Sequence, residues 1–99
     1  MSSITVTAAQ LKSTAEQLEG LNNQFKSAVS NLESQEQSLC SMWEGEAKNS
    51  FDAAFKRDKN NMDLFNANIM KYVAALRTIA AKYEQAEQTN VSTANQRSY

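Results

Sequence analysis

Residues 43–51 read Trp-Glu-Gly-Glu-Ala-Lys-Asn-Ser-Phe, and this stretch near the middle of the chain gives the strongest indication of the fold. It contains Gly45, one of only 2 glycines in 99 residues that include no proline. Glycine adopts the positive φ angles of a sharp turn, whereas the Ala, Gln, Glu, Lys and Leu residues that are plentiful on both sides favour helix. The stretch therefore predicts a bend between two helices.

The segment before the bend carries apolar side chains at alternating spacings of three and four residues, which is typical of a helix that packs along one stripe. The stripe consists of Leu11, Ala15, Leu18, Phe25, Val29, Leu32, Leu39 and Trp43, with Asn22 and Glu36 at the remaining positions and Leu21, Ala28 and Met42 beside them. Thr7 and Gln10 have the spacing of a capping box, which satisfies backbone groups at the start of a helix. We expect a first helix over residues 8–42.

The segment after the bend has the same spacing and predicts a second helix over residues 47–87. Its stripe consists of Phe51, Phe55, Met62, Phe65, Ile69, Tyr72, Leu76, Ile79, Tyr83 and Ala86, with Asp58 as the single charged member. If residues 43–46 form a tight bend, the two helices run antiparallel and Phe25 meets Phe65. The fold class is then all-α, a helix-turn-helix hairpin shaped as a rod.

The hairpin occupies residues 1–87 as one domain, and residues 88–99 continue without an apolar rhythm. We expect this last segment to be a flexible C-terminal tail. Two helices alone cover only part of each stripe, and a long exposed apolar surface marks an interaction face. We therefore expect two hairpins to pack as a dimer, an elongated four-helix bundle.

The composition argues against several classes of function. There is no histidine, which removes the commonest general base and neutral metal ligand, and Glu44 and Glu46 have no pocket to perturb them. We expect no enzyme activity, no cofactor and no metal. The net charge of -1 supplies no field to attract nucleic acid.

Membrane association is also disfavoured by the sequence. No apolar run reaches membrane-spanning length, and the polar faces are not strongly basic, so membrane contact and a membrane-lytic role have only weak support. Residues 1–12 lack the basic and apolar regions of a signal peptide. We expect a protein made in the cytosol.

A few polar residues lie on or beside the apolar stripes. Asn22, Glu36 and Asp58 are expected to set the register of the helices at a cost in stability. Cys40 lies near the bend, and we expect it to be a small buried side chain. A disulfide between two subunits after export is the alternative.

The bend motif Trp43-x-Gly45-x-Ala-x-x-x-Phe51 is followed, near the end of the second helix, by Tyr83-x-x-x-Glu87. Together with two helical runs in about one hundred residues, these motifs resemble the WXG family of small type VII secretion proteins, the ESAT-like or Esx proteins. The resemblance covers essentially the whole chain. It implies a hairpin that usually dimerises and is exported by an ATPase-driven membrane machine of mycobacteria and Gram-positive bacteria.

The resemblance also implies an export signal in two parts, Trp43 with Gly45 and Tyr83 with Glu87. Because Glu87 lies off the apolar stripe, we expect it to serve recognition rather than packing. Trp43 and Tyr83 lie at opposite ends of one rod, so only an antiparallel dimer could join them into one surface.

The leading interpretation is a small protein secreted without a signal peptide, exported as a folded dimer and acting as an effector, for example in virulence, or as a secretion component. Its partners would be a second copy or a related WXG protein, and the type VII secretion membrane ATPase. A second interpretation is an intracellular adaptor that escorts a larger secreted toxin. A chain that folds only with a co-expressed partner would favour the second.

Overall fold

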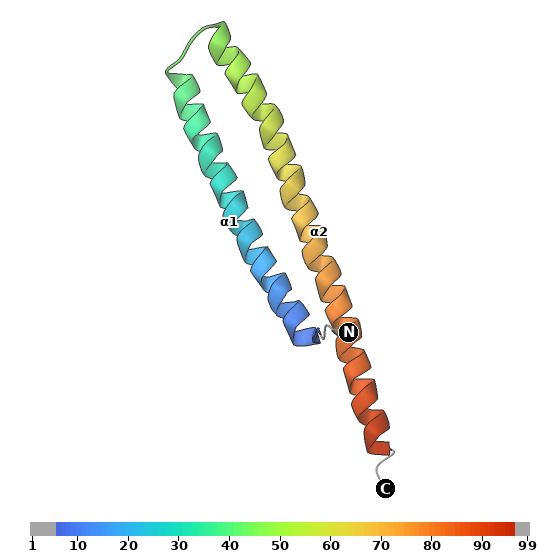
Figure 1. Cartoon of the computed structure of the whole chain (residues 1–99). Coiled ribbons are helices and arrows are strands. Elements are labelled where there is room, and N and C mark those ends of the chain that lie inside the picture. The colour runs from blue at the N-terminus through green and yellow to red at the C-terminus, as the bar shows by residue number, and fades with distance from the viewer. Residues whose placement is uncertain (1–5, 97–99) are drawn as a thin grey trace, which may run out of the picture.

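The computed structural model describes residues 6–96, and the side chains of residues 6–90. Two helices, α1 (Ala8–Ser41) and α2 (Glu46–Gln96), run antiparallel and form one hairpin (Figure 1). The molecule measures 83 × 24 × 19 Å and has a radius of gyration of 22.7 Å. A compact domain of this length would have a radius of gyration of about 13 Å. The predictions of an all-α hairpin and of a rod are confirmed.

The start of α1 is fixed by the predicted capping box. The backbone N–H of Gln10 donates to Thr7 Oγ1 at 3.1 Å, and the backbone N–H of Thr7 donates to Gln10 Oε1 at 3.0 Å. Each side chain thus satisfies a backbone N–H group that has no partner within the helix. This part of the sequence prediction is confirmed.

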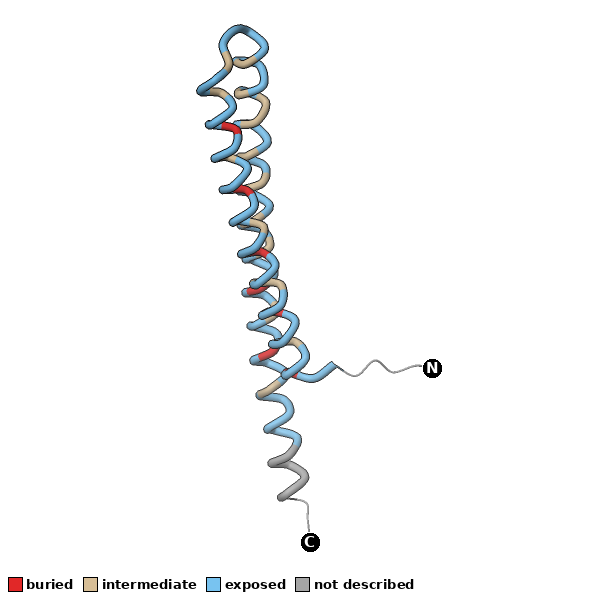
Figure 2. The backbone as a smooth tube through the Cα atoms, turned by 90° about the vertical axis from the view of Figure 1, so that its left-hand side faces the viewer, coloured by how far each residue is buried: buried red, intermediate tan, exposed pale blue. Residues whose placement is uncertain are grey.

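The buried residues of α1 recur every seventh position, and Figure 2 shows short buried segments spaced along the length of the paired helices. They are Ala8, Ala15, Asn22, Val29 and Glu36, and the buried residues of α2 are Val73 and Ala80. The distance between two helix axes depends on the side chains that lie between them. Side chains that point directly at the other helix must therefore be small, or must be polar and bound to a partner. The centre of the hairpin is therefore narrow, and the large apolar side chains lie beside it.

The inner side of α2 differs from the expected stripe. Phe55, Met62, Ile69 and Leu76 are partly buried, whereas Phe51, Asp58, Phe65, Tyr72 and Ile79 are exposed. The residues of α2 that face α1 are instead a row spaced by seven positions, which contains Asn66, Val73 and Ala80. The expectation that Asp58 lies in the seam of the hairpin was wrong, because the small side chains of Val73 and Ala80 allow a close approach of the helices that turns the row of Asp58 outward.

The two sides of the hairpin are unlike. The residues that follow each buried position of α1 by four lie on one side of the hairpin. This side carries three ion pairs between the helices, which are Lys12 with Glu84, Glu19 with Arg77 at 3.0 Å, and Glu33 with Lys59 at 3.7 Å. We call this side the charged flank. Residues three after each buried position lie on the other side of the stripe. They are Leu11, Leu18, Phe25, Leu32 and Leu39, and with Phe51, Phe65, Tyr72 and Ile79 of α2 they form the apolar flank.

The helix ends near the bend agree with the expected ones to within one residue, so the connection covers residues 42–45. At the other end α2 continues to Gln96, so the expected helix end at residue 87 was wrong. The loss of apolar rhythm removes packing but not helix, since no glycine or proline follows residue 45. Residues 97–99 of the expected tail lie outside the described residues. Within the described part of the chain, neither helix contains a segment long and apolar enough to cross a bilayer.

Candidate functional site

The bend is built around Gly45, whose φ angle is 114°. This angle is strained for residues with a Cβ, although a Cβ built at Gly45 would meet no atom within 4 Å. The carbonyl of Gly45 accepts the backbone N–H of Asn49 at 3.2 Å, which begins α2. The role of Gly45 at this place is conformational rather than steric.

Trp43 closes the bend over the first turns of α2. Its ring lies against Phe51, with 5.8 Å between ring centroids and 46° between ring planes. The Trp43 side chain is only partly buried, so the indole contributes both to packing and to the surface at the bend.

The open end of the hairpin holds the second motif. Glu87 Oε1 accepts the backbone N–H of Ala8 at 3.3 Å, at the N-terminus of α1. A carboxylate is stabilised there by the unpaired N–H groups and by the helix dipole. The expectation that Glu87 has no packing role was therefore wrong, and Glu87 ties the two helices together where α1 begins. Tyr83, one turn earlier, is 45% exposed in the single hairpin.

The two motifs lie far apart in one chain. Trp43 is at the bend and Tyr83 at the open end, so the length of α2 between them is about 55 Å at 1.5 Å per residue. Figure 1 shows the bend and the open end at opposite ends of the paired helices. One hairpin cannot present both motifs on one surface.

A titratable cluster lies on the charged flank near the bend. Cys40 Sγ donates to Glu36 Oε2 at 2.9 Å, and Lys56 Nζ binds Asp52 Oδ2 at 2.9 Å. One ligand atom each from Glu36, Cys40 and Asp52 lies within 4.8 Å of the others. The hydrogen bond to Glu36, and then desolvation, raise the pKa of the Cys40 thiol. The hydrogen bond that Lys56 donates to Asp52 lowers the pKa of that carboxyl.

This cluster changes the expectation for Cys40. The thiol is partly exposed rather than buried, and it lies among carboxylates instead of apolar side chains. It also lies on the charged flank, opposite the apolar flank. Two hairpins that pack through their apolar flanks would keep their Cys40 thiols apart, which disfavours a disulfide between subunits.

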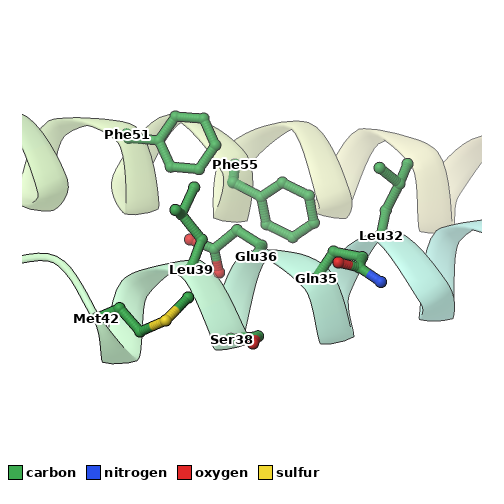
Figure 3. A pocket seen from close by; sticks show the side chains of 8 residues that line it. All are labelled: Leu32, Gln35, Glu36, Ser38, Leu39, Met42, Phe51 and Phe55. Carbon is green, nitrogen blue, oxygen red and sulfur yellow. The ribbon is translucent and has the colours of Figure 1, made fainter.

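The apolar flank contains two shallow hollows. The one near the bend is lined by both helices, with Leu39 of α1 beside Phe51 and Phe55 of α2, and polar side chains of α1 also contribute to it (Figure 3). The second lies at mid-length between Leu21 and Phe65. There the rings of Phe25 and Phe65 meet edge to face with 5.5 Å between centroids, which confirms the predicted contact.

Most large side chains of the apolar flank and beside it are solvent-exposed in the single hairpin, whereas Leu11, Leu18 and Phe25 are partly buried. Leu21 is 60% exposed, Phe65 55% and Tyr72 61%. The other exposed members are Leu32, Leu39, Phe51 and Ile79, and the exposed Leu21, Met42 and Tyr83 adjoin the flank. Exposed apolar side chains that continue along a whole molecule are rare in monomers and mark a surface that binds another protein.

Residues 3–88 match the sequence profile of WXG100, described as proteins of 100 residues with WXG. The chain belongs to this family. The match includes both Trp43-Glu44-Gly45 at the bend and Tyr83 at the open end. A comparison with curated proteins finds no match.

Solved structures share the helical hairpin. A crystal structure of the secreted protein EsxB from Bacillus anthracis strain Sterne is similar with a TM-score of 0.78 and 23% identity over 88% of this chain and 99% of that one. A wild-type EsxB crystal structure has a TM-score of 0.75 and 24% identity over 84% of this chain and 89% of that one. At this level of identity the likeness establishes the fold.

Proposed function

We propose that this WXG100 protein is a small substrate or component of a type VII secretion system that leaves the cell as a folded helical dimer. The observation that supports it is the family match over residues 3–88, which includes the Trp-x-Gly bend. The structurally similar EsxB is described as a secreted protein. The role is binding and export rather than catalysis, with the protein serving as an effector or as a part that the machine requires.

The dimer is proposed because the apolar flank has no partner within the hairpin. Side chains such as Leu21, Phe65 and Tyr72 would be removed from water by a second helical hairpin, and each fully buried large apolar side chain stabilises a complex by about 1.5–3 kcal/mol before association costs. The partner in this dimer is either a second copy or a related WXG protein.

The export signal is proposed to be composite. In an antiparallel dimer, the bend of one hairpin lies beside the open end of the other, so Trp43 of one chain and Tyr83 of its partner form one surface. Gly45 shapes the bend, and Glu87 holds α1 against α2 at the open end. The membrane ATPase of the system would then recognise the assembled dimer and not the single chain.

The proposal is tested by measuring the protein in culture supernatant and in cell lysate, with the secretion ATPase present and deleted. We expect the supernatant signal to depend on the ATPase, while the lysate level rises in its absence. Equal supernatant levels in both strains would refute export by this route. A cytosolic protein released by lysis serves as the control for leakage.

An intracellular adaptor that escorts a larger toxin is the second candidate, because the same apolar flank could bind a helical domain of another protein. The purified chain separates the two functions. A stable dimer formed without other proteins supports the exported dimer, whereas a chain that folds only with a co-expressed toxin domain supports the adaptor.

A further inference from the structure

We propose that the partner on the apolar flank is a second copy of this chain, arranged about a two-fold axis beside Phe65. In this arrangement Asp58 of each copy accepts a hydrogen bond from the Tyr72 hydroxyl of the other. The inference rests on the dimer proposed above and specifies its partner and register. It makes Asp58 and Tyr72 the residues that determine pairing.

The argument begins with one row of α2, in which every seventh residue points out of the apolar flank. The row consists of Phe51, Asp58, Phe65, Tyr72 and Ile79. All five are exposed, from 41% for Phe51 to 61% for Tyr72 among the large apolar members. Residues seven apart lie about 10.5 Å apart along a helix, on nearly the same face. This row would meet the equivalent row of an antiparallel second copy.

The row is self-complementary about its middle member. Asp58 and Tyr72 each lie seven residues from Phe65, and Phe51 and Ile79 each lie fourteen residues from it. A two-fold axis beside Phe65 therefore places Asp58 opposite Tyr72 of the second copy on both sides of the axis. It also places Phe51 opposite Ile79, so apolar groups meet apolar groups.

Asp58 decides between this register and its neighbours. It is the single charged residue of the row, and none of the ion pairs within the described residues includes it. Moving the axis by half a heptad in either direction places Asp58 opposite Phe65 or opposite Ile79. A carboxylate buried against hydrocarbon is costly, whereas a phenol hydroxyl is a good donor to it. Only the register centred on Phe65 supplies that donor.

The outward row of α1 agrees with the same axis. It contains Leu21 and Ala28, which are both exposed, and their midpoint lies beside Phe25. Phe25 is in contact with Phe65, so the two rows are centred at the same height. In the antiparallel arrangement the large Leu21 lies opposite the small Ala28 of the second copy, which favours close packing.

The charges beside the flank favour a second copy over a different chain. The next row of α1 outside the flank is uncharged, with Gln10, Gln17, Gln24, Asn31 and Ser38. The three ion pairs that join α1 to α2 lie within the hairpin on the other flank. Charges at the edges of helical interfaces select unlike partners, and few are present here to do so.

Cross-linking tests the register directly. In a Cys40→Ser background, Phe65→Cys places one thiol per chain beside the axis, and Asp58→Cys with Tyr72→Cys places two reciprocal pairs. Oxidised glutathione should link both variants into covalent dimers, because facing helices bring such Cβ atoms within disulfide range. Asp58→Cys alone, Tyr72→Cys alone and Leu64→Cys on the outer face of α2 are the controls and should stay unlinked. The paired variant keeps Phe65, so a folding defect of Phe65→Cys does not remove the test.

A thermodynamic cycle tests the proposed hydrogen bond. Tyr72→Phe leaves Asp58 buried without a donor and should raise the dimer dissociation constant about tenfold or more, measured by analytical ultracentrifugation. Adding Asp58→Leu to Tyr72→Phe should recover part of this loss. Additive effects of the two changes would overturn the pairing.

The outcomes also separate this inference from the proposed function. A monomer at micromolar concentration, or a dimer in which only the controls cross-link, overturns the two-fold pairing. Either result leaves ATPase-dependent export to be decided by the supernatant assay. Loss of export with an intact, cross-linkable dimer overturns the proposed function and leaves the pairing standing.

Discussion

Asn22 and Asn66 bind each other across the middle of the hairpin through three hydrogen bonds. Asn66 Nδ2 donates to Asn22 Oδ1 at 2.9 Å and to the Asn22 carbonyl at 3.2 Å, and Asn22 Nδ2 donates to the Asn66 carbonyl at 3.1 Å. Asn22 is only 4% exposed, so the alternative of bonding to water is lost. The pair joins α1 to α2 at one register, because a shift by one residue breaks all three bonds.

We expect Asn22→Ala to lower the free energy of unfolding by about 1–3 kcal/mol, since it leaves buried polar groups of α2 without a partner. Asn23→Ala, one residue along on the exposed surface, is the matched control and should change stability little. Urea unfolding at one chain concentration measures both. Equal stabilities of the two variants would show that the pair contributes nothing.

The two glycines should respond to alanine in opposite directions. Gly45 has a positive φ angle, so Gly45→Ala strains the backbone and should destabilise the hairpin by about 1–3 kcal/mol. Gly20 lies inside α1 with no atom near the position of a Cβ, so Gly20→Ala should stabilise it by about 1 kcal/mol. Thermal unfolding at a fixed chain concentration gives both signs. Two stabilising or two destabilising changes would contradict this account of the bend.

The Cys40 thiol should react slowly with iodoacetamide near pH 8, because its hydrogen bond to Glu36 raises its pKa. Glu36→Gln removes the charged acceptor and should increase the rate. Glu33→Gln on the same helix is the control and should leave it unchanged. A rate that is unaffected by Glu36→Gln would contradict the role of Glu36.

The same raised pKa has a consequence for stability. The unfolded thiol ionises near its ordinary value of 9.0, and the folded thiol ionises only at higher pH. The thiol therefore contributes fully to the stability of the folded state below about pH 9, and this contribution is lost as the pH rises through the pKa of the folded state. The wild type should lose stability in this alkaline range more steeply than Cys40→Ser, as measured by urea unfolding across pH.

A composite signal predicts complementation between two inactive chains. Trp43→Ala and Tyr83→Ala should each abolish export when expressed alone. In a mixed dimer, one composite surface contains both substitutions. The other contains the intact Trp43 of the Tyr83→Ala chain and the intact Tyr83 of the Trp43→Ala chain. Co-expression with two different tags should therefore restore both chains to the culture supernatant.

The two variants must still pair for this test to be informative, which co-purification of the two tags verifies. Mixed dimers that form but remain in the cell would contradict a signal shared between chains. Glu87→Gln is a useful further variant, because a glutamine oxygen can still accept the N–H of Ala8 while the charge is removed.

The helices and the bend follow from local chemistry and could be predicted from the sequence. The Thr7 and Gln10 side chains start α1 within their own turn, and Gly45 supplies the one positive φ angle among the described residues. Heptad spacing then indicated the hairpin and the contact of Phe25 with Phe65. These features depend on residues close in sequence or on a strict period, so they need no knowledge of the packed structure.

The rotation of α2 could not be predicted in the same way. Apolar residues of α2 occupy two neighbouring rows, one with Phe65 and Tyr72 and one with Ile69 and Leu76, and the sequence favours these rows for the contact with α1. The row that faces α1 is instead a third one, because helices approach more closely across Ala80 and Val73, and this rotation turns Phe65 and Tyr72 outward. The sequence does contain a signal for this inner row, a seven-residue repeat that ends in the small residues Val73 and Ala80. The signal is hard to recognise because the earlier members of the row, Asp52, Lys59 and Asn66, are polar.

Two helices, a bend at Gly45 and the two motifs of this WXG100 protein follow from the sequence alone. The role of each polar residue in the stripes follows only from the packing of the two helices. Asn22 binds Asn66 and Glu36 binds Cys40 inside the hairpin, Glu87 binds the start of α1, and Asp58 stays exposed on the apolar flank. The reason is that these roles depend on how two helices rotate about their own axes, and that rotation is set by contacts between residues far apart in the chain.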